Sequence, residues 1–256
     1  MILQVKELTK KFSGLIALNR VTFEISKGSI TALIGPNGAG KTTLLQVISG
    51  ILRASSGFIQ YKQTDITRAP PHIISSLGLA RTFQLIRLFP NMTVLENVMT
   101  GIHIQSKSGI FSSGLRLPKA REEEKRIREE SLSLLEFMGI GNKADQLATS
   151  LPYGQQGLVE ICRALGSKPR LLMLDEPAAG MNPYEKKILA EKIIDIKTKG
   201  VTVLLIEHDV GMVMDISDWI VVLEYGLVIA RGTSEVIQKD QKVIEAYLGK
   251  KTDTDA

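Results

Sequence analysis

The sequence lacks the features of a secreted or membrane-spanning chain. Its 256 residues include one cysteine, Cys162, so no internal disulfide can form. No apolar run approaches the roughly 20 residues that a helix needs to cross a bilayer. The first residues lack the basic and apolar regions of a secretory signal. These absences predict a reducing compartment, with neither a membrane span nor a signal peptide.

Aromatic residues are also scarce, at 5% of the chain, and the net charge of +5 is dispersed. The densest charged run, residues 119–130, holds five basic and five acidic residues, which is typical of a solvated helix face with i,i+4 ion pairs. No aromatic residue is interleaved with it, so nucleic-acid binding is not expected. Hydrophobic residues at 44% predict a sizeable core, in which Cys162 is expected to be a buried structural thiol.

One glycine-rich stretch stands out among the residues that are present. It comprises Gly35, Pro36, Asn37, Gly38, Ala39, Gly40, Lys41, Thr42 and Thr43. It fits the pattern G-x-x-x-x-G-K-[ST]. The apolar, β-branched run 30–34 before it is typical of a buried strand, and the run 43–48 after it has helical spacing. Strand, glycine loop and helix in this order predict a phosphate-binding loop.

The chemistry of such a loop accounts for its residue types. Glycines let backbone N–H groups approach phosphates, because a Cβ would block that approach, and the helix N-terminus favours the anion. Lys41 places a positive charge near the β- and γ-phosphates, and the Thr42 hydroxyl can ligate Mg²⁺. The stretch therefore predicts a nucleotide site with magnesium.

A second apolar run, 171–174, ends in Asp175 and Glu176. Sheets of α/β proteins bind ligands at the carboxyl ends of their strands, so both carboxylates are expected near the glycine loop. Asp175 can hold Mg²⁺ directly or through water, and Glu176 can act as a general base or orient the attacking water. The alternative, a solvated acidic turn, is disfavoured by the glycine loop in the same chain.

Three further residues have roles that depend on this context. His208 follows the apolar run 203–206 and would reach the γ-phosphate if that strand lies beside the strand before the glycine loop. Gln84, after a strand-like stretch, could reach the metal and the attacking water, although by itself it is only a loop residue. Phe12 could stack on adenine or could equally be a core aromatic.

The periodicity along the chain predicts an α/β fold. Strands are expected over 2–8, 21–25, 30–34, 57–61, 77–83, 171–174, 201–206, 219–223 and 227–230. Helices are expected over 43–48, 94–99, 121–138, 154–165, 184–197, 210–216 and 241–248, with a short one opening at 70–71. The alternation indicates a mostly parallel sheet that is covered on both faces, after a β-rich opening.

One region departs from this alternation. The span 91–150 is expected to be an inserted helical region that begins with Thr93 as a cap and Glu96 as its capping-box partner. A loop is expected over 106–118. We predict a single domain over 1–250 and a flexible tail over 251–256.

Taken in order, these motifs resemble the nucleotide-binding domain of an ABC transporter. The glycine loop, Gln84, Leu-Pro-Tyr-Gly-Gln at 151–155, Asp175-Glu176 and His208 carry the resemblance, which covers essentially the whole chain. It implies a P-loop NTPase of the ABC type, with a mostly parallel core sheet, an N-terminal antiparallel β subdomain and an inserted helical subdomain. It also implies ATP and Mg²⁺ as cofactors, with Thr42, Gln84 and Asp175 around the metal.

The resemblance also assigns roles. Phe12 would lie under the adenine, Gln84 would be the Q-loop residue, Glu176 the catalytic carboxylate and His208 the switch histidine. The family's signature motif would include Pro152, Tyr153, Gly154 and Gln155. In such proteins the signature presses on the γ-phosphate held by a partner domain, so that two domains sandwich two nucleotides.

The stretches 79–98, 175–183 and 206–209 closely resemble the ATP-binding subunits of branched-chain and related neutral amino-acid importers. This implies an ATPase that pairs with a second ABC ATPase subunit, either a different one or another copy. Two transmembrane permease subunits and an extracytoplasmic solute-binding protein would complete the importer. The chain would lie peripherally on the cytoplasmic face of the cell (inner) membrane. An importer of another small solute, such as urea, and a soluble ABC-type ATPase acting on nucleic acid or ribosomes are the alternatives.

The signature departs from the family's usual Leu-Ser-Gly-Gly-Gln. Pro152 replaces the serine, and Tyr153 replaces a glycine. Proline lacks both the hydroxyl and the N–H group, so the site that this signature completes is expected to be weaker. We expect Pro152→Ser to raise the ATPase rate of the assembled complex; an unchanged or lower rate would contradict this.

Overall fold

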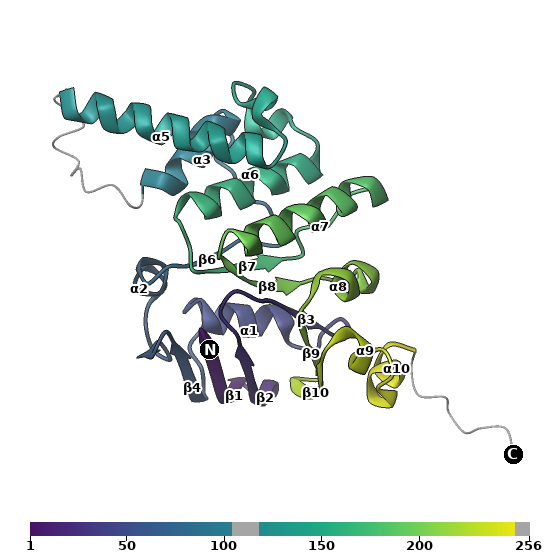
Figure 1. The fold of residues 1–256 in the computed structure, drawn as a ribbon. Coiled ribbons are helices and arrows are strands. Elements are labelled where there is room, and N and C mark those ends of the chain that lie inside the picture. The colour runs from purple at the N-terminus through teal and green to yellow at the C-terminus, as the bar shows by residue number, and fades with distance from the viewer. Residues whose placement is uncertain (104–117, 249–256) are drawn as a thin grey trace, which may run out of the picture.

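A computed structural model of the chain describes residues 1–103 and 118–248 (Figure 1). The tail predicted over 251–256, and the predicted 106–118 loop up to residue 117, lie outside the described residues. The strands are β1 (Leu3–Phe12), β2 (Leu15–Ile25), β3 (Ile30–Ile34), β4 (Ser56–Tyr61), β5 (Thr64–Asp65), β6 (Leu79–Arg81), β7 (Leu171–Asp175), β8 (Thr202–Ile206), β9 (Trp219–Glu224) and β10 (Leu227–Gly232). The helices are α1 (Lys41–Ile48), α2 (Pro71–Ser76), α3 (Val94–His103), α5 (Pro118–Phe137), α6 (Tyr153–Gly166), α7 (Pro183–Thr198), α8 (Val210–Ile216), α9 (Ser234–Ile237) and α10 (Gln241–Leu248), with 3-10 turns η1 (Gly141–Lys143) and η2 (Ala148–Ser150).

Within the described residues, the central sheet has six strands in the order β10-β9-β3-β8-β7-β6. Neighbouring strands from β9 to β6 run parallel, and β10 is antiparallel to β9. All positions of β3, β7 and β8 are buried. In β8, Leu204 and Ile206 belong to one core cluster, whereas Val203 and Leu205 belong to another. The predicted parallel sheet with two covered faces is therefore confirmed.

One face of the central sheet is covered by α1 and by an antiparallel sheet of order β2-β1-β4-β5 (Figure 1). Leu44 of α1 shares a buried cluster with Leu3 of β1 and Leu33 of β3. The N-terminal antiparallel subdomain is thus present. Strand β2 begins earlier than the predicted residue 21, because Leu15 pairs with Phe12 across a tight turn and extends the hairpin.

The other face carries α6, α7 and α8, with α3 and α5 beyond them (Figure 1). Thr93 and Glu96 form the predicted capping box. The Thr93 hydroxyl accepts the Glu96 N–H at 3.1 Å, and the Glu96 carboxylate accepts the Thr93 N–H at 2.8 Å. Helix α6 packs against both α3 and α5. We therefore propose that the helical region predicted over 91–150 extends to Gly166, within the single domain predicted over 1–250.

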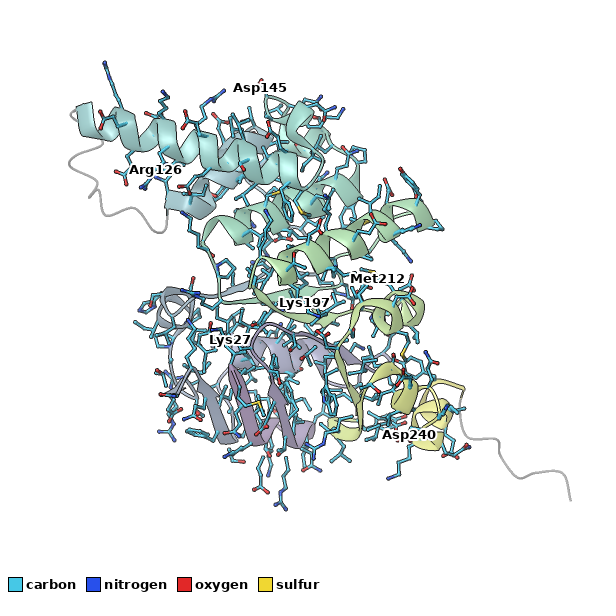
Figure 2. The ribbon with its side chains drawn as sticks, viewed as in Figure 1. Lys27, Arg126, Asp145, Lys197, Met212 and Asp240 are labelled. Atoms are coloured by element: carbon cyan, nitrogen blue, oxygen red, sulfur yellow. The ribbon has the colours of Figure 1, made fainter. Side chains whose placement is uncertain are left out.

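The side chains of α5, Arg126 among them, project from the helix at the edge of the molecule (Figure 2). Helix α5 carries exposed i,i+4 pairs, with Nζ of Lys125 3.8 Å from Glu129 and Nε of Arg126 3.9 Å from Glu130. Cys162 is fully buried, as predicted, and burial raises the pKa of its thiol. In the described part of the chain, no helix has the length and apolarity of a membrane span.

Candidate functional site

The glycine loop joins β3 to α1. Gly40 has φ 105° and directly precedes the helix, and a Cβ there would lie 2.7 Å from the carbonyl oxygen of Ala17. Only glycine fits this conformation and this contact. The Lys41 ammonium is buried and donates to the carbonyls of Gly35 at 2.8 Å and Pro36 at 3.1 Å. Burial lowers the pKa of Lys41, and the charges of the neighbouring acidic residues oppose that shift.

A cavity of about 1000 Å³ opens over this loop. It is lined by residues from separate parts of the chain: Phe12, Leu15, Ile16, Ala17, Asn37, Gly38, Ala39, Gly40, Lys41, Thr42, Thr43, Gln84, Glu176, His208 and Tyr225. Phe12 is 39% exposed, so it is not a core aromatic. The Lys10 ammonium lies 4.7 Å from its centroid. The structure thus brings Phe12, the glycine loop, Gln84, Glu176 and His208 to one cavity.

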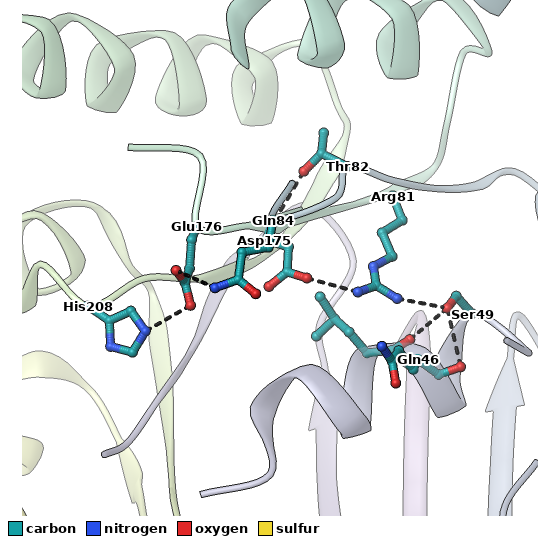
Figure 3. Close-up of polar contacts among 9 residues, drawn as sticks. Gln46, Ser49, Arg81, Thr82, Gln84, Asp175, Glu176 and His208 are labelled. Carbon is teal, nitrogen blue, oxygen red and sulfur yellow. Dashed lines mark hydrogen bonds and ion pairs between the residues drawn. The ribbon is translucent and has the colours of Figure 1, made fainter. Parts of the chain in front are cut away.

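The sheet order explains why Glu176 and His208 meet. Strand β8 lies between β3 and β7 and is parallel to both, so all three strands end at one edge of the sheet. Oε1 of Glu176 lies 2.8 Å from Nε2 of His208, and the Gln84 amide donates to Oε2 of Glu176 at 3.0 Å (Figure 3). The Glu176 side chain is only 16% exposed. Its carboxylate is therefore held from both sides at the cavity wall.

The backbone of Glu176 is in the left-handed region, with φ 52°. A non-glycine residue in this region is strained and persists only where its surroundings hold it. The Glu176 N–H donates to the Ile206 carbonyl at 2.9 Å, and the Glu176 carbonyl accepts the Ala179 N–H at 3.2 Å. Strain of this kind is concentrated at functional sites.

Asp175 is buried and forms an ion pair with Arg81, from Oδ2 to Nη2 at 2.8 Å (Figure 3). Burial raises the pKa of the Asp175 carboxyl, whereas the hydrogen bond and charge of Arg81 lower it. Among the residues that the structure describes, Oδ1 of Asp175 has no hydrogen-bond partner. An unpartnered carboxylate oxygen beside the phosphate loop fits a hard cation such as Mg²⁺. The described residues hold no group of three or more His, Cys, Asp or Glu that could bind a metal by themselves.

The stretch 152–155 begins α6 and does not line the cavity over the glycine loop. Pro152 is the N-cap, and Tyr153 is 45% exposed and donates its hydroxyl hydrogen to the Gln84 carbonyl at 3.3 Å. Gly154 is buried against Met181, where a Cβ would lie 3.0 Å from Cγ. Within the described ranges, Oε1 of Gln155 is buried without a partner. Tyr153 therefore contacts this chain's own Gln84 loop.

Sequence reasoning missed four residues near the site. Arg81 pairs with Asp175, Thr82 Oγ1 accepts the Asp175 N–H at 3.2 Å, and Tyr225 lines the cavity. Glu207, next to His208, is only 5% exposed. A signal existed for Arg81, which lies in the strand predicted over 77–83, and for Tyr225, which precedes a glycine between two predicted strands.

The fold and the cavity define a class of protein: a P-loop nucleoside triphosphatase with paired carboxylates at the edge of a parallel sheet. Comparison with known proteins narrows this class. Residues 18–179 match the family model described as ABC transporter, and residues 228–252 match the model described as branched-chain amino acid ATP-binding cassette transporter. The chain belongs to the ABC transporter family of ATP-binding proteins, which hydrolyse ATP to power transport.

Individual relatives are similar over nearly their full length. The high-affinity branched-chain amino acid transport ATP-binding protein LivG of Salmonella typhimurium is 42% identical over 97% of this chain and 98% of its own. The corresponding BraF of Pseudomonas aeruginosa is 41% identical over 97% and 98%. An ABC transporter cassette solved in its ADP conformation has a TM-score of 0.84 and 35% identity over 97% of this chain and 98% of its own.

Proposed function

We propose that this chain is the ATP-hydrolysing subunit of an importer for branched-chain amino acids. The observation that carries the hydrolytic role is the Glu176 carboxylate, held between Gln84 and His208 at the wall of the cavity over the glycine loop. The cargo is supported by the LivG and BraF relatives and by the matching C-terminal model at 228–252.

In this proposal, the residues of the cavity have separate roles in binding the nucleotide and in activating water. Phe12 stacks on the adenine, while the glycine-loop N–H groups and Lys41 bind the phosphates. Glu176 takes the proton of the attacking water, and His208 and Gln84 orient its carboxylate. Because Glu176 is mostly buried and bonded on both oxygens, little reorganisation is needed when the water reacts.

We also propose Mg²⁺ as the metal of this site. Thr42 lines the cavity, and Asp175, at the end of β7, has a carboxylate oxygen without a partner among the described residues; Gln84 is the third candidate contact. When bound, the cation would neutralise charge on the β- and γ-phosphates. Phosphate oxygens would complete the coordination, because the protein supplies few ligands.

We propose further that 152–155 acts on a nucleotide held by a second ATPase subunit. Pro152, Tyr153, Gly154 and Gln155 lie outside this chain's own nucleotide cavity, which supports a role toward a partner. A different subunit or a second copy would satisfy this arrangement. Two permease subunits and, indirectly, an extracytoplasmic binding protein would complete an assembly on the cytoplasmic face of the cell membrane.

A groove beside the Gln84 loop supports the permease contact. It has a volume of about 530 Å³, and its lining combines apolar residues such as Ile51 and Phe89 with the charged residues Arg81, Glu160 and Arg163. In the same loop, Leu85 is 74% exposed.

Replacement of Leu85 by a charged residue should reduce the amount of permease that co-purifies with this chain from detergent-solubilised membranes. Recovery of the wild-type chain only in an RNA- or ribosome-bound pool would contradict the importer.

The hydrolytic role is tested by Glu176→Gln. Loss of a general base lowers a rate about 10²–10⁴-fold, so we expect a steady-state ATPase kcat lower by about two orders of magnitude or more, with ATP still bound. Undiminished activity would remove Glu176 from the mechanism.

The cargo is tested in cells that lack this chain, by comparing their uptake of labelled leucine, isoleucine and valine with their uptake of labelled urea. A defect confined to urea would contradict the amino-acid assignment.

A further inference from the structure

Glu207 is a buried carboxylate that has no part in the roles described above. It lies between the end of β8 and His208, and it is only 5% exposed. Its Oε1 accepts the Ala178 N–H at 2.7 Å, and its Oε2 accepts the His208 N–H at 3.1 Å. The bond to Ala178 thus joins the loop of Glu207 to a loop 29 residues earlier, while the bond from His208 fixes the other oxygen within its own loop.

The two loops carry the residues that meet at the proposed water-activating centre. Ala178 is the second residue after Glu176, in the turn where Glu176 adopts its strained φ of 52°. His208 lies in the loop that follows β8, and Nε2 of its ring lies 2.8 Å from Oε1 of Glu176. The position of Glu176 relative to His208 therefore depends on how these loops are joined.

A second contact joins the loop of His208 to α7, the helix that follows the turn after Glu176. Lys186 of α7 donates to Oδ2 of Asp209 at 2.8 Å, while Oδ1 of Asp209 accepts the Met212 N–H and caps α8. Both side chains of this ion pair are about one-third exposed. The hydrogen bonds of Glu207, by contrast, are buried, so water does not compete for them.

We propose that Glu207 is a positioning residue for ATP hydrolysis, whose carboxylate joins the turn after Glu176 to the loop of His208 and holds these two side chains in contact. The inference rests on the proposed hydrolytic role of Glu176. A carboxylate suits the position because both oxygens accept hydrogen bonds. A glutamine of the same size keeps one acceptor oxygen but directs its NH₂ group at one of the two N–H donors, so the hydrogen bonds from Ala178 and His208 cannot both be kept. Glu207→Gln therefore loses one of these two hydrogen bonds without changing side-chain size.

The test is the steady-state ATPase of the purified full chain. A misplacement of about 1 Å can cost about 10²-fold in rate, so we expect Glu207→Gln to lower kcat about 10–100-fold while the KM for ATP changes less than about twofold. In a Glu176→Gln background, the same change should lower kcat by less than about twofold, because the carboxylate to be positioned is already gone. Glu207→Asp is the second variant: it keeps the charge but is one methylene too short to reach both loops, so it should also lower kcat.

Asp218→Asn is the matched control. Asp218 also accepts a backbone N–H, from Ile30 at 2.7 Å, and bonds a second element through Lys197. It lies at the opposite end of β3 from the glycine loop, so its loss should leave kcat unchanged. Wild-type kcat in Glu207→Gln, or an equal effect of both changes, would overturn the inference. Should Glu207→Gln fail to fold by circular dichroism, wild-type kcat in Glu207→Asp would overturn it. Wild-type kcat in Glu176→Gln would instead overturn the proposed function.

Discussion

The buried ion pair between Arg81 and Asp175 allows a quantitative prediction for Arg81→Met. The two side chains are 7% and 1% exposed, and Nη2 of Arg81 lies 2.8 Å from Oδ2 of Asp175. Removing one partner of a buried pair costs about 3–5 kcal/mol, because the other charge remains without compensation. For a chain of this size about 1 kcal/mol corresponds to roughly 2–4 °C in Tm. We therefore expect a Tm lower by about 6–20 °C.

The loss should also depend on pH. Burial raises the pKa of Asp175, and Arg81 opposes that shift, so the pKa should rise further in the variant. Such a carboxyl has a higher pKa in the folded chain than in the unfolded chain. It destabilises the fold most at pH values above its folded pKa, where it must be ionised while buried. This cost disappears as pH falls to the unfolded pKa. The difference in unfolding free energy between variant and wild type should therefore be largest near neutral pH and smaller toward about pH 4.

Urea denaturation at both pH values measures this difference. Arg20→Met is the matched control, because Arg20 pairs with Glu7 at the surface with side chains 70% and 63% exposed, and we expect little change in stability from its loss. The double variant with Asp175→Asn should recover much of the Arg81→Met loss. A loss no larger than that of Arg20→Met, or one independent of pH, would refute the reasoning.

Two further substitutions test the cavity. Gly40→Ala should lower ATP affinity at least about tenfold and cost about 1–3 kcal/mol, because its φ of 105° and a Cβ contact of 2.7 Å cannot be relieved without moving the loop; unchanged titration with a fluorescent nucleotide would contradict this. Tyr225→Asn should maintain or raise the unfolding free energy, because the two-residue hairpin 225–226 has φ of 45° and 77° and favours Asn-Gly. The same change should weaken nucleotide binding severalfold, because Tyr225 lines the cavity; affinity equal to wild type would exclude it from the site.

The parts of the site that lie within single motifs were accessible from the sequence. The glycine loop was predicted from a short pattern and its flanking periodicity. Asp175 and His208 follow buried apolar runs, so the general rule for parallel strands placed them at one edge. The condition set for His208, that its strand lies beside the strand before the glycine loop, is met by the β3–β8 pairing.

The residues that were missed act through partners far away in the chain. Arg81 is 94 residues from Asp175, and Glu207 is 29 residues from Ala178. No local pattern reports which distant donor a buried carboxylate will meet. The hydrogen bond from Tyr153 to Gln84 spans 69 residues and is likewise decided by the packing of α6. Contacts of this kind can be identified only once the tertiary structure is known.

The order of the central strands has a consequence for the synthesis of the chain. Strand β3, which leads into the glycine loop, pairs only with β8 and β9 in the described structure, and Ile30 meets its partner Val203 173 residues later. At about 5–20 residues per second, a ribosome needs roughly 9–35 s to produce that partner. During this interval both edges of this strand, which is buried at every position in the finished fold, are unpaired, which favours aggregation. The early hairpin β1–β2 and helix α1 can cover one face of β3 on the ribosome, but not its edges. Newly made chains should therefore depend on chaperones until about residue 224 has emerged.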